Sequence, residues 1–287
     1  MDEKLDLDRS HAEFINFLST KKRARATIVA YGKDIDQLIS HLKKIGKNTL
    51  TDVTKEDLNG FLEKLGKDSY TPKSVSRKIN SIKTFYRFLK SQGLVTEDPA
   101  ADISHPKYVV KPPRILSKVE YRALRDACRD DLRISAIVEL FLQTGIRIGE
   151  LANLNLDDLN GENLHISPQE SHAERSVPLN KAAKFSIDRY LEIRSKTQNK
   201  TLFITKTGRP LLIRNIRTSI DRYFKLAGIE MAKVNDLRHT FIAHHLMSGT
   251  PLTIISKLVG HKRLSTTEKY LEFVKGTAEK SVKLEEL

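Results

Sequence analysis

The sequence predicts a mainly α-helical protein with a small β-sheet, divided into two domains. Apolar residues recur at three- and four-residue spacing along most of the chain, which indicates amphipathic helices. One proline-rich segment interrupts that spacing, and one stretch of mixed polar and apolar residues near 164–177 indicates a hairpin. With 287 residues the chain has room for two domains, and its 39% hydrophobic and 30% charged content excludes wholesale disorder.

The proline-rich segment spans residues 105–114 and contains Pro106, Pro112 and Pro113. Proline removes a backbone donor and biases the preceding residue toward extended geometry, so this segment should not continue a helix. We therefore expect an N-terminal domain at residues 1–105, a linker at 106–114 and a C-terminal domain at 115–287.

The N-terminal domain is expected to contain four helices. Apolar residues on one side predict helices over residues 11–18 and 26–45. A third helix should follow Thr54, because Asp57 stands three residues later as in a capping box. The fourth should begin at Pro72.

The fourth helix combines an apolar stripe with a basic face. Apolar residues from Val75 to Leu89 step by four, three, four and three, and Gly93 is expected to end the helix. No acidic residue occurs between Ser69 and Thr96. Together with a net charge of +14 and a pI of about 9.7, this face indicates contact with nucleic-acid phosphates, although a solvated surface face remains the alternative. The candidate DNA-binding residues are Lys73, Arg77, Lys78, Lys83 and Arg87.

Composition also limits cofactors and location. Cys128 is the sole cysteine, so an intramolecular disulfide and a cysteine-based metal site are both excluded. The first residues are polar and lack the apolar core of a signal peptide, and no stretch approaches about 18 apolar residues. We expect a cytoplasmic protein with no membrane partner, no metal and no other cofactor.

The C-terminal domain should be mostly helical. Ser117 and Glu120 form a capping-box pattern at its first helix. The further expected elements are an apolar helix at 132–142 ending at Thr144-Gly145, a short helix at 150–156, a hairpin at 164–177, a short strand at 202–204 with a turn at Thr207-Gly208, and helices from Ile213 onward.

Four segments of this domain carry residues suited to anion chemistry. Arg147 stands between two glycines at a helix junction, an unusual place for a surface charge. Asp236 resembles an N-cap, which would place Arg238 in the first turn of a helix, where an anion is favoured. His261 follows a helix that Gly260 should end, and Tyr270 lies nine residues further on.

The order and spacing of these residues resemble the tyrosine recombinases of the Xer and phage-integrase type, over nearly the full chain. The stretches that carry the resemblance read TGIRIGEL, LRHTFIAHHL, LVGHKRLSTTEKY and FYRFLKSQGLVTEDPAADI. The resemblance implies a SAM-like, core-binding N-terminal domain and a catalytic C-terminal domain that together clamp duplex DNA. It also implies strand cleavage through a 3′-phosphotyrosine, with neither ATP nor metal.

The resemblance assigns roles to individual residues. Arg147 and Arg238 would stabilise the charge that develops on the phosphate oxygens, since guanidinium groups supply paired hydrogen bonds and fixed charge. Tyr270 would be the nucleophile, and its phenol needs cationic surroundings because its ordinary pKa is about 10. His261 would donate a hydrogen bond to the phosphate. The role of His239 is left open between catalysis and structure.

Two positions depart from the family pattern. Asn235 stands where the family has a histidine, and an amide cannot shuttle a proton. The hairpin has no lysine to protonate the leaving 5′-oxygen, and Glu170 falls near the lysine position. His172 at the hairpin tip is the candidate substitute, with Lys206 reaching into the site as the alternative.

The leading hypothesis is therefore a site-specific DNA recombinase, acting in chromosome-dimer resolution (chromosome partition) or in integration and excision of a mobile element. The alternatives are a catalytically weakened DNA-binding protein, which Glu170 and Asn235 would explain, and a relaxing enzyme of the type IB topoisomerase kind. By resemblance, the C-terminal helix in residues 274–287 should dock into a neighbouring subunit of a homotetramer on two DNA sites, with a frayed terminus as the alternative. The sequence identifies no accessory protein.

Overall fold

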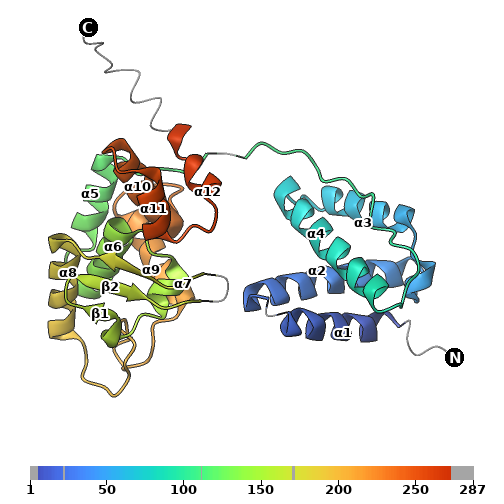
Figure 1. The fold of residues 1–287 in the computed structure, drawn as a ribbon, viewed down its shortest axis with the longest axis horizontal. Coiled ribbons are helices and arrows are strands. Elements are labelled where there is room, and N and C mark those ends of the chain that lie inside the picture. Colours follow the sequence, from blue (N-terminus) through green and yellow to red (C-terminus); the bar gives the residue numbers. More distant parts are fainter. Residues whose placement is uncertain (1–5, 22, 111, 170–171, 273–287) are drawn as a thin grey trace, which may run out of the picture. The chain divides into compact units, whose positions relative to one another are not determined.

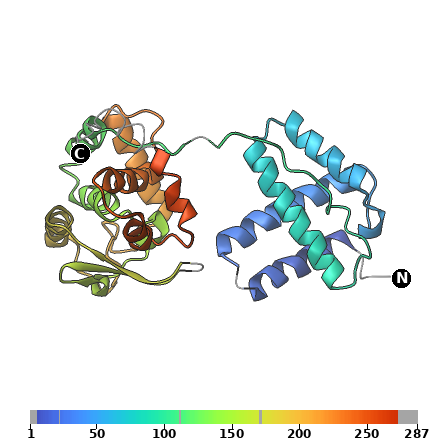
Figure 2. The same cartoon turned by 45° about the horizontal axis from the view of Figure 1, so that its top comes forward.

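The computed structural model describes residues 6–21, 23–110, 112–169 and 172–272. The chain separates into two compact units, residues 1–110 and residues 111–287 (Figures 1 and 2). Both units are mainly helical, and the C-terminal unit also holds a small sheet, which confirms the predicted fold class. None of the helices in these described stretches is long and apolar enough to span a bilayer.

Helices make up the described part of the N-terminal unit, and they pack around one apolar core. Phe14 lies at the centre of this core, with its ring 5.2 Å from that of Phe85 and 5.7 Å from that of Phe88. The helices are α1 (Leu7–Thr20), α2 (Arg25–Lys44), the 3₁₀ turn Leu50–Asp52, α3 (Lys55–Lys67) and α4 (Pro72–Ser91).

The caps of these helices follow from the sequence. Thr54 and Asp57 form the expected reciprocal capping box at the start of α3. Pro72 occupies the first turn of α4, and Gly93 follows the end of that helix with a φ of +68°, a conformation that glycine adopts without strain.

The basic face of α4 is not uniformly directed to solvent. Lys78 is buried, and its ammonium lies 2.9 Å from Asp34 of α2 and 2.6 Å from the side-chain oxygen of Gln37. Arg77 also pairs with Asp34, and Lys83 donates to the carbonyl of Ala101. The acidic partner comes from a helix more than 40 residues earlier in the chain, so the local absence of acidic residues did not reveal it. The position of Lys78 does not support the expected phosphate contact.

Lys73 and Arg87 are exposed on α4. They keep the solvent access that contact with a polyanion requires.

The C-terminal unit places its sheet along one side of its helices (Figure 1). The strands are β1 (Leu159–Asn160), β2 (Asn163–Ile166) and β3 (Arg175–Pro178), antiparallel in that order, with Leu164 opposite Val177. The helices are α5 (Lys118–Ala127), α6 (Leu132–Thr144), α7 (Ile148–Ala152), the 3₁₀ turn Leu156–Asp158, α8 (Lys181–Ile193), α9 (Ile213–Leu226), α10 (Val234–Met247), α11 (Leu252–Val259) and α12 (Ser265–Glu268).

Several expected elements differ in detail. The short helix expected at 150–156 begins earlier, as α7, and is followed by a separate 3₁₀ turn. No strand forms at residues 202–204: Thr201 and Ile204 make isolated bridges, with Asn155 and Pro210 respectively. Helix α8, which the sequence analysis did not assign, begins at the N-cap Asn180, whose side chain accepts a hydrogen bond from the N–H of Ala183.

Helix α6 is the centre of the C-terminal core, since α8 and α10 both pack on it. Gly145 ends α6 with a φ of +60°, and a Cβ there would lie 2.5 Å from the ring of Phe241 on α10. Glycine is therefore required for both the backbone turn and the close approach of these helices. This junction brings the chain directly to Arg147.

We expect Asp34→Ala to destabilise the N-terminal unit strongly, because it leaves the buried ammonium of Lys78 without its carboxylate. Breaking a buried pair by removing one partner costs about 3–5 kcal/mol. Urea unfolding of the full chain, followed by circular dichroism, measures the loss. The control is Asp8→Ala, which removes an exposed carboxylate paired with Lys43 and should change stability far less. Equal effects of the two substitutions would show that the buried cluster has no special role.

Candidate active site

A cavity of about 560 Å³ in the C-terminal unit brings the predicted catalytic residues together, and we call it the arginine pocket. The residues that line it are Arg147, Ile148, Gly149, Glu150, Gln169, His172, Asn235, Arg238, His239, His261, Thr266 and Tyr270. The four residues that the resemblance marks as catalytic all belong to this set, although they come from four separate segments of the chain. Glu170 lies outside the described residues.

Arg147 stands at the N-terminus of α7, in extended backbone conformation. Its Nη1 donates to Glu150 at 2.8 Å, and its Nη2 donates to the carbonyl of Gly260 at 2.7 Å. The backbone N–H of Arg147 also donates to Glu150, which caps the helix. The side chain is 24% exposed, so part of the guanidinium still faces the open cavity.

Glu150 is the buried anion of the pocket, and the sequence analysis gave it no role. It accepts two hydrogen bonds from Arg175 of β3, at 2.9 and 2.7 Å, in a bidentate pair. Burial alone would raise the pKa of Glu150, but the hydrogen bonds from Arg175 and from the N–H of Arg147 outweigh it and lower the pKa to about 2. The carboxylate is therefore ionised at any physiological pH and holds both arginines.

The position of Glu150 carried a local signal. In a capping box, the third residue of a helix is often acidic, and its side chain accepts the backbone N–H of the N-cap residue. Glu150 stands in this relation to Arg147. Arg175 gave no such signal, because its partners Glu150 and the carbonyl of Leu258 are distant in sequence.

Arg238 is buried on α10 and is held by backbone carbonyls. Its Nη1 donates to Gly145, and its Nη2 donates to Val259 at 2.6 Å. In the described part of the chain its guanidinium makes no ion pair. Burial, followed by the positive charge of Arg147, lowers the pKa of Arg238 to about 9, which still leaves it charged at neutral pH. An anion in the pocket would stabilise the charged guanidinium and so raise the pKa of Arg238.

The expected N-cap of α10 was wrong. The helix begins two residues before Asp236, and the carboxylate of Asp236 accepts the N–H of Lys233, so Asp236 is the third helical residue. Arg238 therefore lies in the second turn, beyond the reach of the helix terminus. Its buried neighbours, and not a helix dipole, determine its environment.

His261 follows Gly260, which ends α11 with a φ of +64°. Its Nδ1 lies 2.7 Å from the hydroxyl of the fully buried Thr267. Burial, and then the charges of Arg238 and Arg147, lower the pKa of His261 to about 4. The imidazole is therefore neutral near pH 7, and the hydroxyl of Thr267 orients it.

Tyr270 is buried and packs with apolar residues of α10 and α11, while its hydroxyl reaches the pocket. That hydroxyl lies 2.5 Å from Nδ1 of His239, whose Nε2 lies 2.7 Å from the side-chain nitrogen of Asn235. Burial raises the pKa of Tyr270 to about 12, although the positive charge of Arg238 acts in the opposite direction and lowers that pKa. The phenol is protonated in this state.

The hairpin contributes Gln169 and His172, whose backbones pair with each other. Nδ1 of His172 is buried and has no hydrogen-bond partner among the described residues. Burial, followed by the charge of Arg147, lowers the pKa of His172. A buried ring nitrogen without a partner is costly, so this imidazole is suited to meet a group that enters the pocket.

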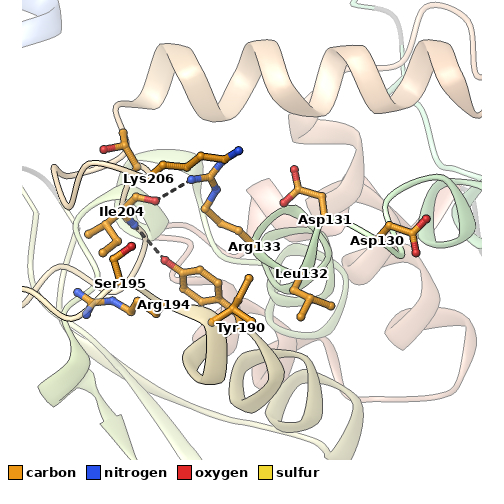
Figure 3. A pocket seen from close by; sticks show the side chains of 11 residues that line it. Asp130, Asp131, Leu132, Arg133, Tyr190, Arg194, Ser195, Ile204 and Lys206 are labelled. Carbon is orange, nitrogen blue, oxygen red and sulfur yellow. Dashed lines mark hydrogen bonds between the residues drawn. The ribbon is translucent and has the colours of Figure 1, made fainter.

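Lys206 does not reach the arginine pocket. Figure 3 shows it beside a different cavity, which Asp130, Asp131 and Arg133 line at the start of α6 and which Tyr190 of α8 also borders. The alternative in which Lys206 replaces the missing hairpin lysine is therefore not supported. Among the described residues no group of three or more histidine, cysteine, aspartate or glutamate side chains is placed to hold a metal ion.

Comparison with known proteins identifies the family of this chain. Residues 114–275 match the phage integrase family, and residues 12–93 match the phage integrase N-terminal SAM-like domain. The chain belongs to the phage integrase family. Tyrosine recombinase XerD of Listeria innocua is 30% identical over 279 residues (92% of this chain, 93% of the relative). Tyrosine recombinase XerC of Thermodesulfovibrio yellowstonii is 31% identical over 272 residues (90% of this chain, 89% of the relative).

Solved structures share the fold at lower identity. A lambda integrase dimer bound to a core site has a TM-score of 0.77 at 18% identity (91% of this chain, 97% of that chain). XerH site-specific recombinase in a post-cleavage complex with a palindromic difH substrate has a TM-score of 0.75 at 18% identity (88% of this chain, 78% of that chain). The predicted enzyme class, a tyrosine recombinase, is confirmed by the family and the relatives.

We expect the stability of the C-terminal unit to fall as the pH drops from about 4.5 toward 2. The pKa of Glu150 is about 2 in the folded chain against 4.5 ordinarily, so its contribution is complete above 4.5 and is lost as pH approaches 2. At 1.36 kcal/mol per pKa unit, that contribution is about 3 kcal/mol. Urea unfolding across this range measures it. Glu150→Gln should lose much of this pH dependence, whereas Glu162→Gln, at an exposed site, should keep it.

Proposed function

We propose that this protein recombines duplex DNA at defined sites, with Tyr270 as the nucleophile. One observation carries the proposal: two arginines, a histidine and a tyrosine from distant segments line one cavity. The phenol oxygen would attack a DNA phosphorus, forming a 3′-phosphotyrosine as the bond to the 5′-oxygen breaks. The phenol loses one proton and the 5′-oxygen gains one, so the exchange is balanced. The bond energy stays in the phosphotyrosine, which a new 5′-hydroxyl can attack.

The arginines are suited to the phosphate because their structural contacts do not exhaust their donors. A guanidinium has five N–H groups. Arg147 and Arg238 each use two in the contacts described above, to a carboxylate or to backbone carbonyls. The others are available for non-bridging oxygens, where negative charge grows in the transition state. His261, neutral and held by Thr267, can add a hydrogen bond to the same group.

His172 is the proposed general acid for the 5′-oxygen. His172 lines the pocket, whose described lining residues include no lysine. Its Nδ1 has no hydrogen-bond partner among the described residues. Burial and the charge of Arg147 lower its pKa, whereas the negative charge of a bound phosphate would raise the pKa of a nearby imidazole. Binding of the substrate would itself favour the protonated form.

DNA binding and assembly are further parts of the proposal. The exposed Lys73 and Arg87 of α4 are the candidates for phosphate contacts outside the pocket. Similar folds have been solved as a lambda integrase dimer on a core site and as a lambda integrase tetramer on a Holliday junction. We propose the same kind of homo-oligomer on paired DNA sites here, in the cytoplasm, with the segment after residue 274, outside the described residues, as the subunit contact.

We expect Tyr270→Phe to abolish covalent attachment of the protein to DNA, since it removes the attacking oxygen. The assay incubates the full chain with sheared genomic DNA of the source organism, stops with detergent and captures protein-linked fragments for sequencing. The fragments define the site, from which nicked suicide duplexes are made for rate measurements. Arg147→Ala and Arg238→Ala should each slow cleavage by about 10²–10³-fold or more.

Tyr108→Phe, at an exposed tyrosine of the linker, is the matched control and should cleave normally. Failure of the unmodified protein to form any adduct, with tight DNA binding retained, would favour the weakened DNA-binding alternative. Relaxation of arbitrary supercoiled plasmids would favour the topoisomerase alternative instead.

The proposed role of His172 predicts a defect that depends on the leaving group. His172→Ala should slow cleavage of an ordinary suicide duplex by about 10²–10⁴-fold, the usual worth of general acid catalysis. A duplex with sulfur in place of the bridging 5′-oxygen releases a thiolate, which needs no proton, so the variant should cleave it at nearly the unmodified rate. His165→Ala, an exposed histidine on β2, is the control. An equal defect on both duplexes would assign His172 a structural role.

A further inference from the structure

Three side chains form a hydrogen-bonded row that ends at the proposed nucleophile. The hydroxyl oxygen of Tyr270 lies 2.5 Å from Nδ1 of His239, and Nε2 of the same ring lies 2.7 Å from Nδ2 of Asn235. Asn235 and His239 are four residues apart on α10, so their side chains lie one above the other on the same face of the helix. All three residues line the arginine pocket.

The chemistry of the amide sets the direction of these hydrogen bonds. The side-chain nitrogen of Asn235 has protons and no available lone pair, so it can only donate to Nε2. Nε2 of His239 can accept from the Asn235 amide only in the neutral ring, and burial favours that form by lowering the pKa of His239. A neutral imidazole that accepts at Nε2 carries its proton on Nδ1. The Nδ1–H of His239 therefore donates to the oxygen of Tyr270.

We propose that His239 is a catalytic residue that donates a hydrogen bond to the attacking oxygen, and that Asn235 is a positioning residue that fixes the tautomer of His239. The proposal rests on the proposed function of Tyr270 as nucleophile. A phenolate accepts a stronger hydrogen bond than a phenol does, so this donor stabilises the reactive form. It also holds the oxygen at the pocket while the ring of Tyr270 stays packed among apolar residues.

Asn235 suits this task because its amide does not titrate. A carboxylate at the same place would accept a hydrogen bond from Nε2–H, and a neutral ring would then have Nδ1 as its acceptor. The histidine donor would then be lost, although the packing would hardly change. Asn235, where the family has a histidine, therefore serves His239 one turn later by donating a hydrogen bond to its Nε2.

The tautomer is testable without DNA. Long-range proton–nitrogen correlation spectra of the full chain, labelled with ¹⁵N-histidine, show which ring nitrogen carries the proton, and His239→Asn identifies the resonance. The expected result is Nδ1–H in the unmodified protein and Nε2–H in Asn235→Asp. A proton on Nε2 of His239 in the unmodified protein would overturn the proposal, whatever the protein does to DNA.

Cleavage of nicked suicide duplexes tests the role in the reaction. His239→Ala should be slower by about 10- to 100-fold, the usual worth of a hydrogen bond to a charged group. His239→Asn should recover much of that rate, because its amide places an N–H near the position of Nδ1. His245→Ala is the matched control, since this histidine of α10 contacts Phe241 and does not line the pocket.

The two measurements separate the possible failures. Normal rates in His239→Ala, or no recovery in His239→Asn when both variants fold normally by circular dichroism, would overturn the role of His239. Absence of any covalent adduct in the unmodified protein would instead overturn the role of Tyr270, and the tautomer spectrum would still decide the direction of the hydrogen bonds.

Discussion

The pocket depends on one buried carboxylate between two guanidinium groups. Like charges repel strongly where water is excluded, so neighbouring arginines need an anion that stays ionised. Glu150 meets this need with a bidentate pair to Arg175 and contacts to both the backbone and the side chain of Arg147. Glu150 is shared between Arg175 and Arg147, and Arg238 makes no ion pair among the described residues, so one carboxylate faces three guanidinium groups. A phosphate in the pocket can supply the further negative charge.

The end of α11 complements this carboxylate. The carbonyls of Leu258, Val259 and Gly260 each accept a hydrogen bond from a different arginine: Arg175, Arg238 and Arg147 respectively. The last carbonyls of a helix have no partner within it and carry its negative end. Because Gly260 turns the backbone into the left-handed region at this point, these carbonyls are available to side chains from three other segments.

Apolar spacing predicted the helical architecture, because it is local information. The resemblance to the family, and not spacing alone, marked Arg147, Arg238, His261 and Tyr270, which the structure brings to one pocket. The sequence also placed Thr54, Ser117, Gly93 and Gly260 correctly, since caps depend on a few neighbouring residues. Helix α8 was missed because only three of its residues are buried, which leaves a weak apolar stripe.

The errors at the functional residues have a different physical origin. Asp34 pairs with Arg77 and Lys78 of α4 from another helix, and the contact between His239 and Tyr270 joins residues 31 positions apart. Neither can be inferred from one segment alone.

The three arginines that share the end of α11 also come from distant segments, and their shared contacts have a thermodynamic consequence. Their substitutions should be non-additive, with double replacements costing less than the sum of single ones, because the three guanidinium groups behave as one cooperative unit.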